Sequence, residues 1–550
     1  MTQTKHGGQV LVEALERQGV KRVFSVPGES YLPVLDGLHD ARIENIVTRH
    51  EGGAAMMAEA CGKLNGTPGV AMVTRGPGAT NASAGVHIAF QDSTPMVLFI
   101  GQVASDQRDR EAFQEVDYRA MFAPLAKWVA EIDRVDRIPE YVNRAFQTAM
   151  SGRPGPVVLA LPEDMLSSEC DSPITPAATL PSALASQSDL EATLALLKQA
   201  ERPLVILGGR NWSAAAARAM AHVAQTLDLP VTASFRCQDF LDNRHSNYVG
   251  EMGIGANPDL AQNVRDADVI LSLGARLGEI TTAGYTLIES PLPQQKLVHV
   301  HLDPNEIGRV YHPTLAVNAD AGKMVQQLSE MLQDTDAAAP SDRTKTARLS
   351  YENWQKPVET PGALKMENVI AHLNDVLQDD AIVTNGAGNY SAWLHRYYRY
   401  RNHGTQLAPT SGSMGYGLPA AVAAKIERPD QEVICLAGDG CFQMSMQEFG
   451  VACENDANII VLISNNGMYG TIRLHQQKKF PKRPSGTSMQ NPDFAVIAQS
   501  YGAFGATVRT DAEFVTAFAA ARASGKPAII DMRIDPDALS PVARLETLDS

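Results

Sequence analysis

Cysteine is scarce in this chain. Six cysteines occur among 550 residues, and no two of them are spaced as a Cys-x-x-Cys pair. A disulfide scaffold needs a much higher density of cysteine, so the sequence predicts six reduced thiols, as in a cytoplasmic protein. Basic residues are also in deficit, because 47 Lys and Arg face 62 Asp and Glu and give a formal net charge of −15. This balance argues against nucleic acid as a partner, since such binding needs clustered cations.

Long hydrophobic runs are absent as well. A segment that spans a bilayer needs about 18 apolar residues, whereas residues 459–463, among the longest runs here, have the length of a strand. Residues 1–10 are polar and lack the apolar core of a signal peptide. We therefore expect no membrane partner. Hydrophobic residues make up 44% and charged residues 20%, which is the usage of globular rather than disordered proteins.

Short apolar runs alternate with helical patterns along the chain, which predicts an α/β protein of doubly wound parallel sheets. Strands are expected at residues 22–27, 69–74, 96–101, 156–162, 203–208, 269–274, 297–303, 381–385, 432–438, 459–464 and 527–532. Residues 167–188 and 334–346 are rich in small and polar residues and predict linkers. We accordingly expect three domains, at residues 1–166, 189–335 and 360–540.

Two polar motifs follow neighbouring strands of the last domain. Gly438, Asp439 and Gly440 end one apolar run, and Asn465 and Asn466 end the next. Either motif alone is typical of a turn, but together they place a carboxylate and a carboxamide in one crevice at the carboxyl edge of a sheet. Such hard oxygen ligands suit Mg²⁺, and the glycines let backbone N–H groups approach a diphosphate.

This pattern is that of thiamine diphosphate enzymes, and the resemblance extends over the whole chain. Segments similar to the acetolactate (acetohydroxyacid) synthase catalytic subunits occur in consistent order. They are residues 49–55 (Arg-His-Glu-Gly-Gly-Ala-Ala), 69–81, 112–117 (Ala-Phe-Gln-Glu-Val-Asp), 152–157 and 412–421 (Gly-Ser-Met-Gly-Tyr-Gly-Leu-Pro-Ala-Ala). The resemblance implies a pyrimidine-binding, a central and a diphosphate-binding domain. It also implies a homodimer or homotetramer with active sites at the subunit interface.

The resemblance assigns a role to each candidate site residue. Glu51 matches the carboxylate that promotes the imino tautomer of the cofactor, so that the cofactor's own amino group can remove the thiazolium proton. Met414 matches the apolar wedge that bends the cofactor, and Gly412 the carbonyl that faces its amino group. Gly28, Phe113 and Gln114 match substrate-side positions. The remaining implied cofactor contacts are Pro77, Asn81, Gly438, Asp439, Gly440, Asn466, Met468 and Tyr469, of which Asp439, Asn466 and the Met468 carbonyl are the expected Mg²⁺ ligands.

The implied activity is decarboxylation of a small 2-keto acid and transfer of the resulting enamine to a carbonyl acceptor, which is either a 2-keto acid or an aldehyde. Three alternatives stay open. The first is a decarboxylase or acyl transferase of the same superfamily, although no His-His pair is present. The second is a catalytically idle cofactor-binding subunit, against which intact Glu51, Asp439 and Asn466 speak. The third is a flavin oxidase of the pyruvate oxidase kind.

The chain departs from the family pattern at several positions. Glu29 stands where a glycine is usual and would place an extra carboxylate near the reaction centre, unless it turns away or is protonated. Arg75 replaces a small serine and would reshape the pocket or bind an anionic acceptor. Residues 274–280 keep only part of the flavin loop, which argues against FAD. Residues 470–476 lack the tryptophan that favours 2-ketobutyrate as acceptor, so the sequence leaves the donor, the acceptor and any regulatory subunit open.

Overall fold

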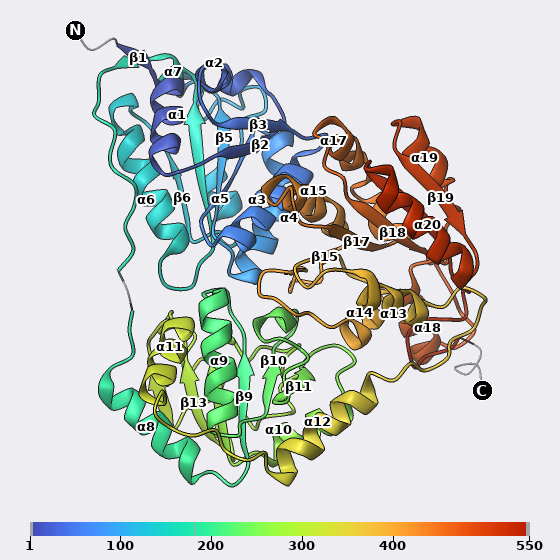
Figure 1. Ribbon diagram of the computed structural model, residues 1–550. Helices are drawn as coiled ribbons and strands as arrows, with labels where there is room; N and C mark the ends of the chain where they lie inside the picture. The colour runs from blue at the N-terminus through green and yellow to red at the C-terminus, as the bar shows by residue number, and fades with distance from the viewer. Residues whose placement is uncertain (1–3, 182, 546–550) are drawn as a thin grey trace. The chain divides into compact units, whose positions relative to one another are not determined.

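The computed structural model describes residues 4–181 and 183–545. Three six-stranded sheets follow one another along the chain, with helices on their faces (Figure 1). Within each sheet, every neighbouring pair of strands is parallel. This architecture confirms the prediction of an α/β chain with three doubly wound parallel sheets, and all eleven predicted strands are present.

The first sheet has the order β3-β2-β4-β5-β7-β6. Its strands are β2 (Arg22–Ser25), β3 (Glu44–Val47), β4 (Gly69–Val73), β5 (Met96–Gln102), β6 (Trp128–Glu131) and β7 (Pro156–Pro162). Its helices are α1 (Gly7–Arg17), α2 (Leu32–His39), α3 (Glu51–Asn65), α4 (Pro77–Asp92), α5 (Tyr118–Phe122), α6 (Ile138–Met150) and α7 (Glu163–Ser167). Strands β4, β5 and β7 are buried at every residue. Helices cover both faces of such a sheet, which explains why these strands are uninterrupted apolar runs.

The central sheet has the order β11-β10-β9-β12-β13-β14. Its strands are β9 (Pro203–Leu207), β10 (Val231–Ala233), β11 (Tyr248–Glu251), β12 (Val269–Leu273), β13 (Lys296–Val300) and β14 (Leu315–Val317). It is accompanied by α8 (Gln187–Gln199), α9 (Ala214–Thr226), α10 (Pro258–Asp266) and α11 (Ala321–Met331). The sequence pattern missed the short strands β10, β11 and β14, because three or four residues carry too little periodicity to distinguish a strand from a loop.

The third sheet has the order β16-β15-β17-β18-β20-β19. Its strands are β15 (Ile382–Asn385), β16 (Gln406–Leu407), β17 (Val433–Gly438), β18 (Ile460–Asn465), β19 (Phe504–Val508) and β20 (Ala528–Arg533). Its helices are α13 (Met366–Val376), α14 (Ser391–Tyr397), α15 (Gly417–Glu427), α16 (Asp439–Gln443), α17 (Phe449–Glu454), α18 (Gly470–Lys479), α19 (Phe494–Ser500) and α20 (Asp511–Ser524). Numbered within each sheet, the first and third sheets share the order 2-1-3-4-6-5, whereas the central sheet has the order 3-2-1-4-5-6.

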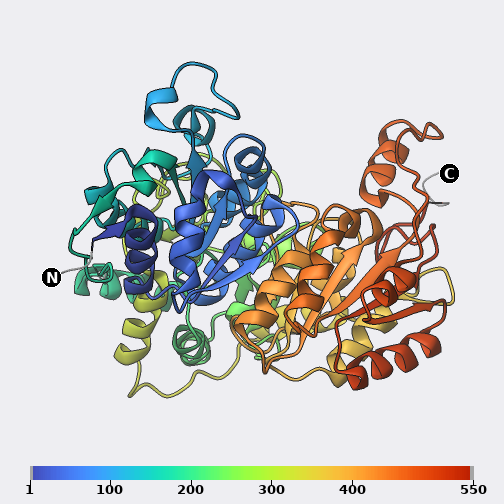
Figure 2. The ribbon, with the colours of Figure 1, turned by 90° about the horizontal axis from the view of Figure 1, so that it is seen from above.

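The chain forms two compact units. One contains the first sheet with residues 409–430 and 443–459, and the other contains the central and third sheets. Helix α15 packs against α3 and therefore belongs to the first unit. In that unit, the light-blue segment around residues 105–117 forms a loop that projects outward (Figure 2). The loop lacks strand pairing, so its shape depends on side-chain and turn hydrogen bonds.

The two predicted linkers differ in outcome. The first prediction holds for residues 171–181 and 183–186, which form neither helix nor strand, but β8 (Glu169–Cys170) and the start of α8 at Gln187 lie inside the predicted range. The second prediction is wrong from Asp342 onward, because α12 (Asp342–Trp354) begins there, with Ser341 as its N-cap. Arg348 of this helix donates hydrogen bonds to the carbonyls of Asn243 and Tyr248, at 2.9 Å each. These contacts order a segment whose composition alone is typical of a flexible connection.

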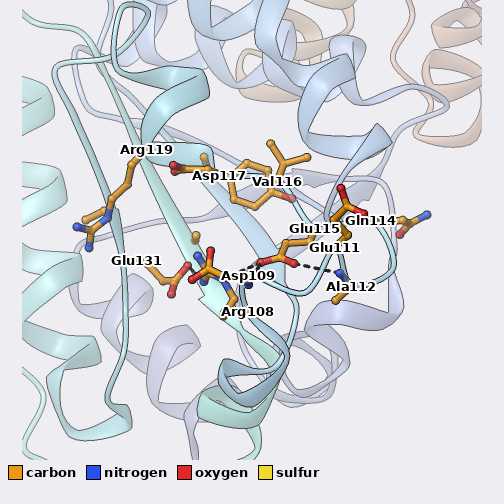
Figure 3. Close-up of a pocket in the computed structure, with 13 residues that line it drawn as sticks. Arg108, Asp109, Glu111, Ala112, Gln114, Glu115, Val116, Asp117, Arg119 and Glu131 are labelled. Carbon is orange, nitrogen blue, oxygen red and sulfur yellow. Dashed lines mark hydrogen bonds and ion pairs between the residues drawn. The ribbon is translucent and has the colours of Figure 1, made fainter.

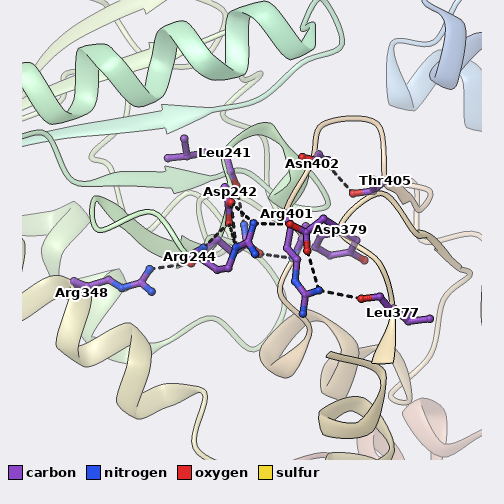
Figure 4. A network of polar contacts seen from close by, with 11 residues as sticks. Leu241, Asp242, Arg244, Arg348, Leu377, Asp379, Arg401, Asn402 and Thr405 are labelled. Carbon is purple, nitrogen blue, oxygen red and sulfur yellow. Dashed lines mark hydrogen bonds and ion pairs between the residues drawn. The ribbon is translucent and has the colours of Figure 1, made fainter. Parts of the chain in front are cut away.

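The central and third sheets are joined by ion pairs within the second unit. Arg244 pairs with Asp242 at 2.8 Å and with Asp379 at 2.9 Å, and Arg401 reaches Asp379 at 3.1 Å (Figure 4). Asn243 adds two hydrogen bonds to the Tyr400 backbone. The partly exposed ion pairs contribute little individually, so the buried Asn243 contacts set the junction more firmly.

Candidate active site

The strand order of the first sheet reverses between β2 and β4, because the chain adds β3 on one side of β2 and β4 on the other side. Ligands of open α/β sheets bind at the carboxyl ends of the strands beside such a switch point. Gly28 follows β2, and Thr74 follows β4. A Cβ atom on Gly28 would lie 2.4 Å from the Thr74 Cβ, so the two loops touch and the position accepts only glycine.

Glu51 is the first residue of α3. His50 caps this helix, because its Nδ1 accepts a hydrogen bond from the Gly52 N–H at 3.0 Å. A carboxylate is favoured at this end of a helix by the helix dipole. Asn81 Nδ2 donates to Glu51 Oε2 at 3.0 Å, and a Cβ on Gly78 would lie 3.3 Å from Oε1. Helices α3 and α4 therefore bring the predicted residues Glu51 and Asn81 together. Pro77, which is also predicted, opens α4.

The projecting loop places Gln114 against the loop after β4. A Cβ on Gly76 would lie 2.8 Å from the Gln114 Cβ, and Gln114 itself has a left-handed φ of 65°. The Gly76 N–H donates to the Tyr118 hydroxyl at 2.8 Å, and burial raises the pKa of Tyr118 to about 12. Phe113 is 73% exposed. The sequence pattern missed Tyr118, because a single tyrosine in a polar segment carries no signal for this contact.

Arg75 and Glu29, the two departures from the family pattern, form an ion pair. Arg75 Nη2 lies 3.0 Å from Glu29 Oε1, and Nη1 lies 3.4 Å from Glu163 Oε2. Arg75 Nε also donates to the Phe113 carbonyl at 3.1 Å. Glu29 is thus turned toward a cation and is not an isolated carboxylate.

A cavity of about 820 Å³ lies beside the projecting loop. The sticks in Figure 3 show its lining of charged and polar side chains, with Gln114 among them. Arg108 pairs with Glu131, and the Asp109 and Ala112 N–H groups donate to the Glu115 carboxylate. These backbone hydrogen bonds lower the pKa of Glu115, and the bond from the Asp109 N–H has the largest effect. The cavity has the size of a small-molecule site.

Residues 410–416 carry the predicted Gly412 and Met414 and are fixed at both ends to α3 and α4. The Thr410 N–H and hydroxyl donate to Asp92 Oδ1 at 2.8 and 2.6 Å. Tyr416 donates to Glu59 Oε2 at 2.5 Å, and Lys63 bridges Glu59 at 3.0 Å and Asp92 at 2.5 Å. All three charged side chains are almost fully buried. Between these anchors Gly412 has a left-handed φ of 68°, and Met414 is only half-buried, unlike a core methionine.

The predicted diphosphate and metal residues meet at the carboxyl edge of the third sheet. Gly438 of β17 pairs with Ser464 of β18, so the two motifs follow adjacent strands as expected. Asp439 accepts hydrogen bonds from the N–H groups of Gly440 and Gly467, each at 2.8 Å. Burial raises the pKa of its carboxyl group. A Cβ on Gly440 would lie 2.7 Å from the Tyr469 ring, so glycine is required there.

Asn466 and Met468 follow β18 in the same loop. Asn466 Oδ1 accepts the Met468 N–H at 3.2 Å. Asn491, which the sequence pattern missed, donates to Asp439 Oδ2 at 2.7 Å and to Asn465 at 2.8 Å. One carboxylate, carboxamide oxygens and a backbone carbonyl form a hard-oxygen donor set that fits Mg²⁺ bound to a diphosphate. Among the described residues there is no cluster of three or more His, Cys, Asp or Glu able to hold a metal ion.

The candidate residues therefore form two groups, one in each unit. The first unit holds Gly28, Glu51, Pro77, Asn81, Phe113, Gln114, Gly412 and Met414, and the second holds Gly438, Asp439, Gly440, Asn466, Met468 and Tyr469. All six cysteines are free thiols, as expected from their spacing. In residues 4–181 and 183–545, none of the helices combines the length and apolar character needed to cross a membrane.

Three family models match this chain in order. The N-terminal TPP binding domain of thiamine pyrophosphate enzymes matches residues 5–121, the central domain of these enzymes matches residues 190–328, and their C-terminal TPP binding domain matches residues 386–532. The matches cover the whole central sheet, most strands of the first and third sheets and both groups of candidate residues.

Individual relatives are similar over nearly the full length. The acetolactate synthase large subunit of Parasynechococcus marenigrum is 33% identical, and the alignment covers 97% of this chain and 88% of that protein. The acetolactate synthase isozyme 3 large subunit of Escherichia coli is 31% identical, and the alignment covers 91% of this chain and 89% of that protein. The mitochondrial acetolactate synthase catalytic subunit of Saccharomyces cerevisiae is 30% identical, and the alignment covers 96% of this chain and 80% of that protein.

Proposed function

This chain belongs to the thiamine pyrophosphate enzyme family, and from that premise we propose that it joins two carbonyl compounds in the manner of an acetolactate synthase. A 2-keto acid donor loses CO₂, and the remaining fragment forms a carbon–carbon bond with the carbonyl carbon of an acceptor. The observation that carries this proposal is the placement of Glu51 at the N-terminus of α3, hydrogen-bonded to Asn81, in a family whose chemistry depends on such a carboxylate.

Thiamine diphosphate supplies, when bound, the carbanion-type carbon that attacks the donor carbonyl. Glu51 would hold the proton that is shared with the pyrimidine ring, and Asn81 would keep the carboxylate oriented toward it. Gly412 would offer its backbone carbonyl to the cofactor amino group, and Met414, which is half-buried, would support the bent cofactor. Pro77 would contact the cofactor from the start of α4.

The diphosphate would bind at the carboxyl edge of the third sheet. Gly438 and Gly440 permit close backbone approach, and Tyr469 lies against Gly440. Asp439, Asn466 and the Met468 carbonyl would hold Mg²⁺, because their oxygen atoms match its preferred ligands. Asn491 would orient the Asp439 carboxylate through the bond at 2.7 Å.

The substrate side would be formed by Gly28, Gln114 and Phe113. Gln114 would hydrogen-bond the acceptor without titrating, and Gly28 would border the developing oxyanion, where preorganised dipoles contribute most. Phe113 is 73% exposed on the projecting loop, so its ring is accessible to a substrate or to a second subunit. We therefore propose a homodimer or homotetramer whose active sites lie between subunits, with domains at 1–166, 189–335 and 360–540.

A donor–acceptor screen with thiamine diphosphate and Mg²⁺ tests the function. CO₂ release and coupled products are followed together, with pyruvate as the first donor. Carbon–carbon products support the proposal, whereas free aldehyde in equal amount to CO₂ indicates the alternative decarboxylase. No CO₂ release with any 2-keto acid indicates an idle cofactor-binding subunit. Light scattering of the purified protein tests the oligomeric state.

Flavin is not part of the proposed reaction. Arg276, in the partly conserved loop after β12, lies 3.5 Å from Glu306. An arginine with this acidic neighbour is a poor match for a pyrophosphate. The absorption spectrum of the purified protein near 450 nm checks this directly, since bound FAD is yellow.

A further inference from the structure

We propose that Arg75 binds the carboxylate of the acceptor substrate, and that Glu29 occupies this position until the acceptor arrives. The inference rests on the proposed function and deepens it, because it makes the preferred acceptor a 2-keto acid and not an aldehyde. It also connects Arg75 and Glu29, two residues that the family pattern does not supply.

The guanidinium of Arg75 is held between partners of very different exposure. Its side chain is 9% exposed, whereas that of Glu29 is 68% exposed and that of Glu163 is 35% exposed. The Glu29 contact is at 3.0 Å and the Glu163 contact at 3.4 Å. Arg75 is therefore a nearly buried cation whose nearer carboxylate reaches it from the solvent side.

These exposures make Glu29 the replaceable partner. A buried cation is destabilising without a neighbouring anion, so the Arg75 position strongly prefers to be paired. Glu29 is 68% exposed, so its carboxylate is well solvated when released, and Glu163 remains beside Arg75 when Glu29 leaves. A substrate carboxylate that makes two parallel bonds to a guanidinium binds more strongly than a single exposed side chain. Exchange of Glu29 for a substrate carboxylate is thus favourable.

Arg75 lies between residues assigned to the reaction. Thr74, its chain neighbour, packs against Gly28 on one side. A Cβ on Gly78 would lie 2.9 Å from Thr74 Cγ2 and 3.3 Å from Glu51 Oε1. Gly76, the other neighbour, contacts Gln114. The arginine therefore belongs to the same loop as the contacts to the oxyanion position, the catalytic carboxylate and the acceptor-side amide.

The acceptor is favoured over the donor as the ligand of Arg75. The donor carboxylate leaves as CO₂, so a strong ion pair to it would stabilise the ground state and oppose decarboxylation. The acceptor carboxylate survives the reaction and is present before and after carbon–carbon bond formation. Binding the acceptor carboxylate therefore accelerates carbon–carbon bond formation and does not slow decarboxylation of the donor.

The test compares two acceptors that differ only in the carboxylate, namely 2-ketobutyrate and propanal, with pyruvate as donor. We expect Arg75→Gln to lower the ratio of kcat/KM for 2-ketobutyrate to that for propanal by about tenfold to a hundredfold. Arg75→Lys keeps the charge but loses the planar guanidinium, so its kcat/KM ratio should lie between those of wild type and Arg75→Gln. Glu29→Gln should raise the ratio several-fold, because the competing carboxylate is removed.

Glu163→Gln is the matched control, since it removes a carboxylate from the same guanidinium. We expect Glu163→Gln to raise the ratio of kcat/KM for 2-ketobutyrate to that for propanal by less than Glu29→Gln does. Equal rises in the two glutamine variants would overturn the exchange and indicate only a general effect of charge. An unchanged ratio in Arg75→Gln, with pyruvate still turned over and an unaltered circular dichroism spectrum, would overturn the anion site itself.

A binding measurement separates this inference from the proposed function. Butyrate and butyramide have no reactive carbonyl, so their binding to the holoenzyme can be followed by ligand-observed NMR without turnover. Butyrate should bind at least about tenfold more weakly to Arg75→Gln, whereas butyramide should be unaffected. If pyruvate is not turned over but this difference holds, the proposed function fails and the anion site stands. If the difference is absent, the anion site is rejected.

Discussion

Asn81 Nδ2 donates a hydrogen bond to Glu51 Oε2 at 3.0 Å, and so joins the fifth residue of α4 to the first residue of α3. The bond restrains the orientation of the Glu51 carboxylate through the Asn81 side chain. A carboxyl group that exchanges a proton with a ligand requires such a fixed geometry. The two helices therefore provide what the proposed chemistry needs before any ligand binds.

Replacement of Glu51 should abolish the proposed chemistry without removing the ligand. We expect Glu51→Gln to lower kcat by about 10² to 10⁴, the usual contribution of a positioned acid or base. Thiamine diphosphate should still bind within a few-fold of the wild-type affinity, measured by quenching of tryptophan fluorescence. Asn81→Ala should lower kcat by a smaller factor, since the carboxylate remains. Turnover unchanged in Glu51→Gln would contradict the role of this residue.

Asp439 should control the response to Mg²⁺. We expect Asp439→Asn to weaken Mg²⁺-dependent binding of thiamine diphosphate by about a hundredfold, because a charged ligand is lost. Asn491→Ala removes the hydrogen bond at 2.7 Å to Asp439. It should weaken Mg²⁺-dependent binding of thiamine diphosphate about tenfold, as is usual for residues that orient a metal ligand. The measurement is titration of the cofactor at several Mg²⁺ concentrations, with EDTA as control. Equal cofactor affinity with Mg²⁺ and with EDTA would exclude the metal site.

The buried Lys63 should determine both stability and cofactor binding. Lys63→Met leaves Glu59 and Asp92 as buried carboxylates without their cation, which should cost about 3–5 kcal/mol of unfolding free energy. Tyr416→Phe removes one hydrogen bond and should cost about 1–3 kcal/mol. Urea unfolding measures both.

The Lys63 network also anchors residues 410–416. Any Lys63 variant that remains folded should therefore bind thiamine diphosphate more weakly than Arg22→Gln, a substitution in a partly exposed ion pair with Glu427 of the same unit. Fluorescence titration compares the two. Equal affinities in the two variants would show that the anchors do not position Gly412 and Met414.

Glu448 should make stability depend on pH. It is fully buried in η5 (Met446–Glu448), and burial raises its pKa from 4.5 to about 7. At low pH the carboxyl group is protonated in both the folded and the unfolded protein. Between pH 4.5 and about 7, the unfolded chain ionises this carboxyl group while the folded protein keeps it protonated, so the folded protein loses about 3 kcal/mol relative to the unfolded chain. Glu448→Gln avoids this loss.

The melting temperature of Glu448→Gln relative to wild type should accordingly rise from pH 5 to about pH 7 and then level off by pH 8. Glu454→Gln is the control, because Glu454 also contacts Arg49 but is 55% exposed. It should change stability by less than about 1 kcal/mol at either pH. A constant difference between Glu448→Gln and wild type across this range would contradict the buried carboxyl.

The apolar runs and the order of the motifs could be read from the sequence, because they are local. Strands such as β5 and β7 are continuous apolar segments of strand length, so their burial between helices follows from composition. Gly438 and Asn466 could be placed together because Gly438 ends one strand and Asn466 directly follows the next. The linker prediction is wrong from Asp342 onward, because polar composition does not reveal a helix that is held by contacts of Arg348.

By itself, the sequence determined three parallel sheets, the positions of the strand ends and the residue types that gather there, because these depend on near neighbours along the chain. Only the tertiary structure decided that Arg75 meets Glu29, that Thr410 is fastened to Asp92 and that Asn491 supports Asp439. These partners are 46, 318 and 52 residues apart. Such contacts have no local periodicity, because they arise only when the strand order and the helices between strands bring distant loops to one edge of a sheet.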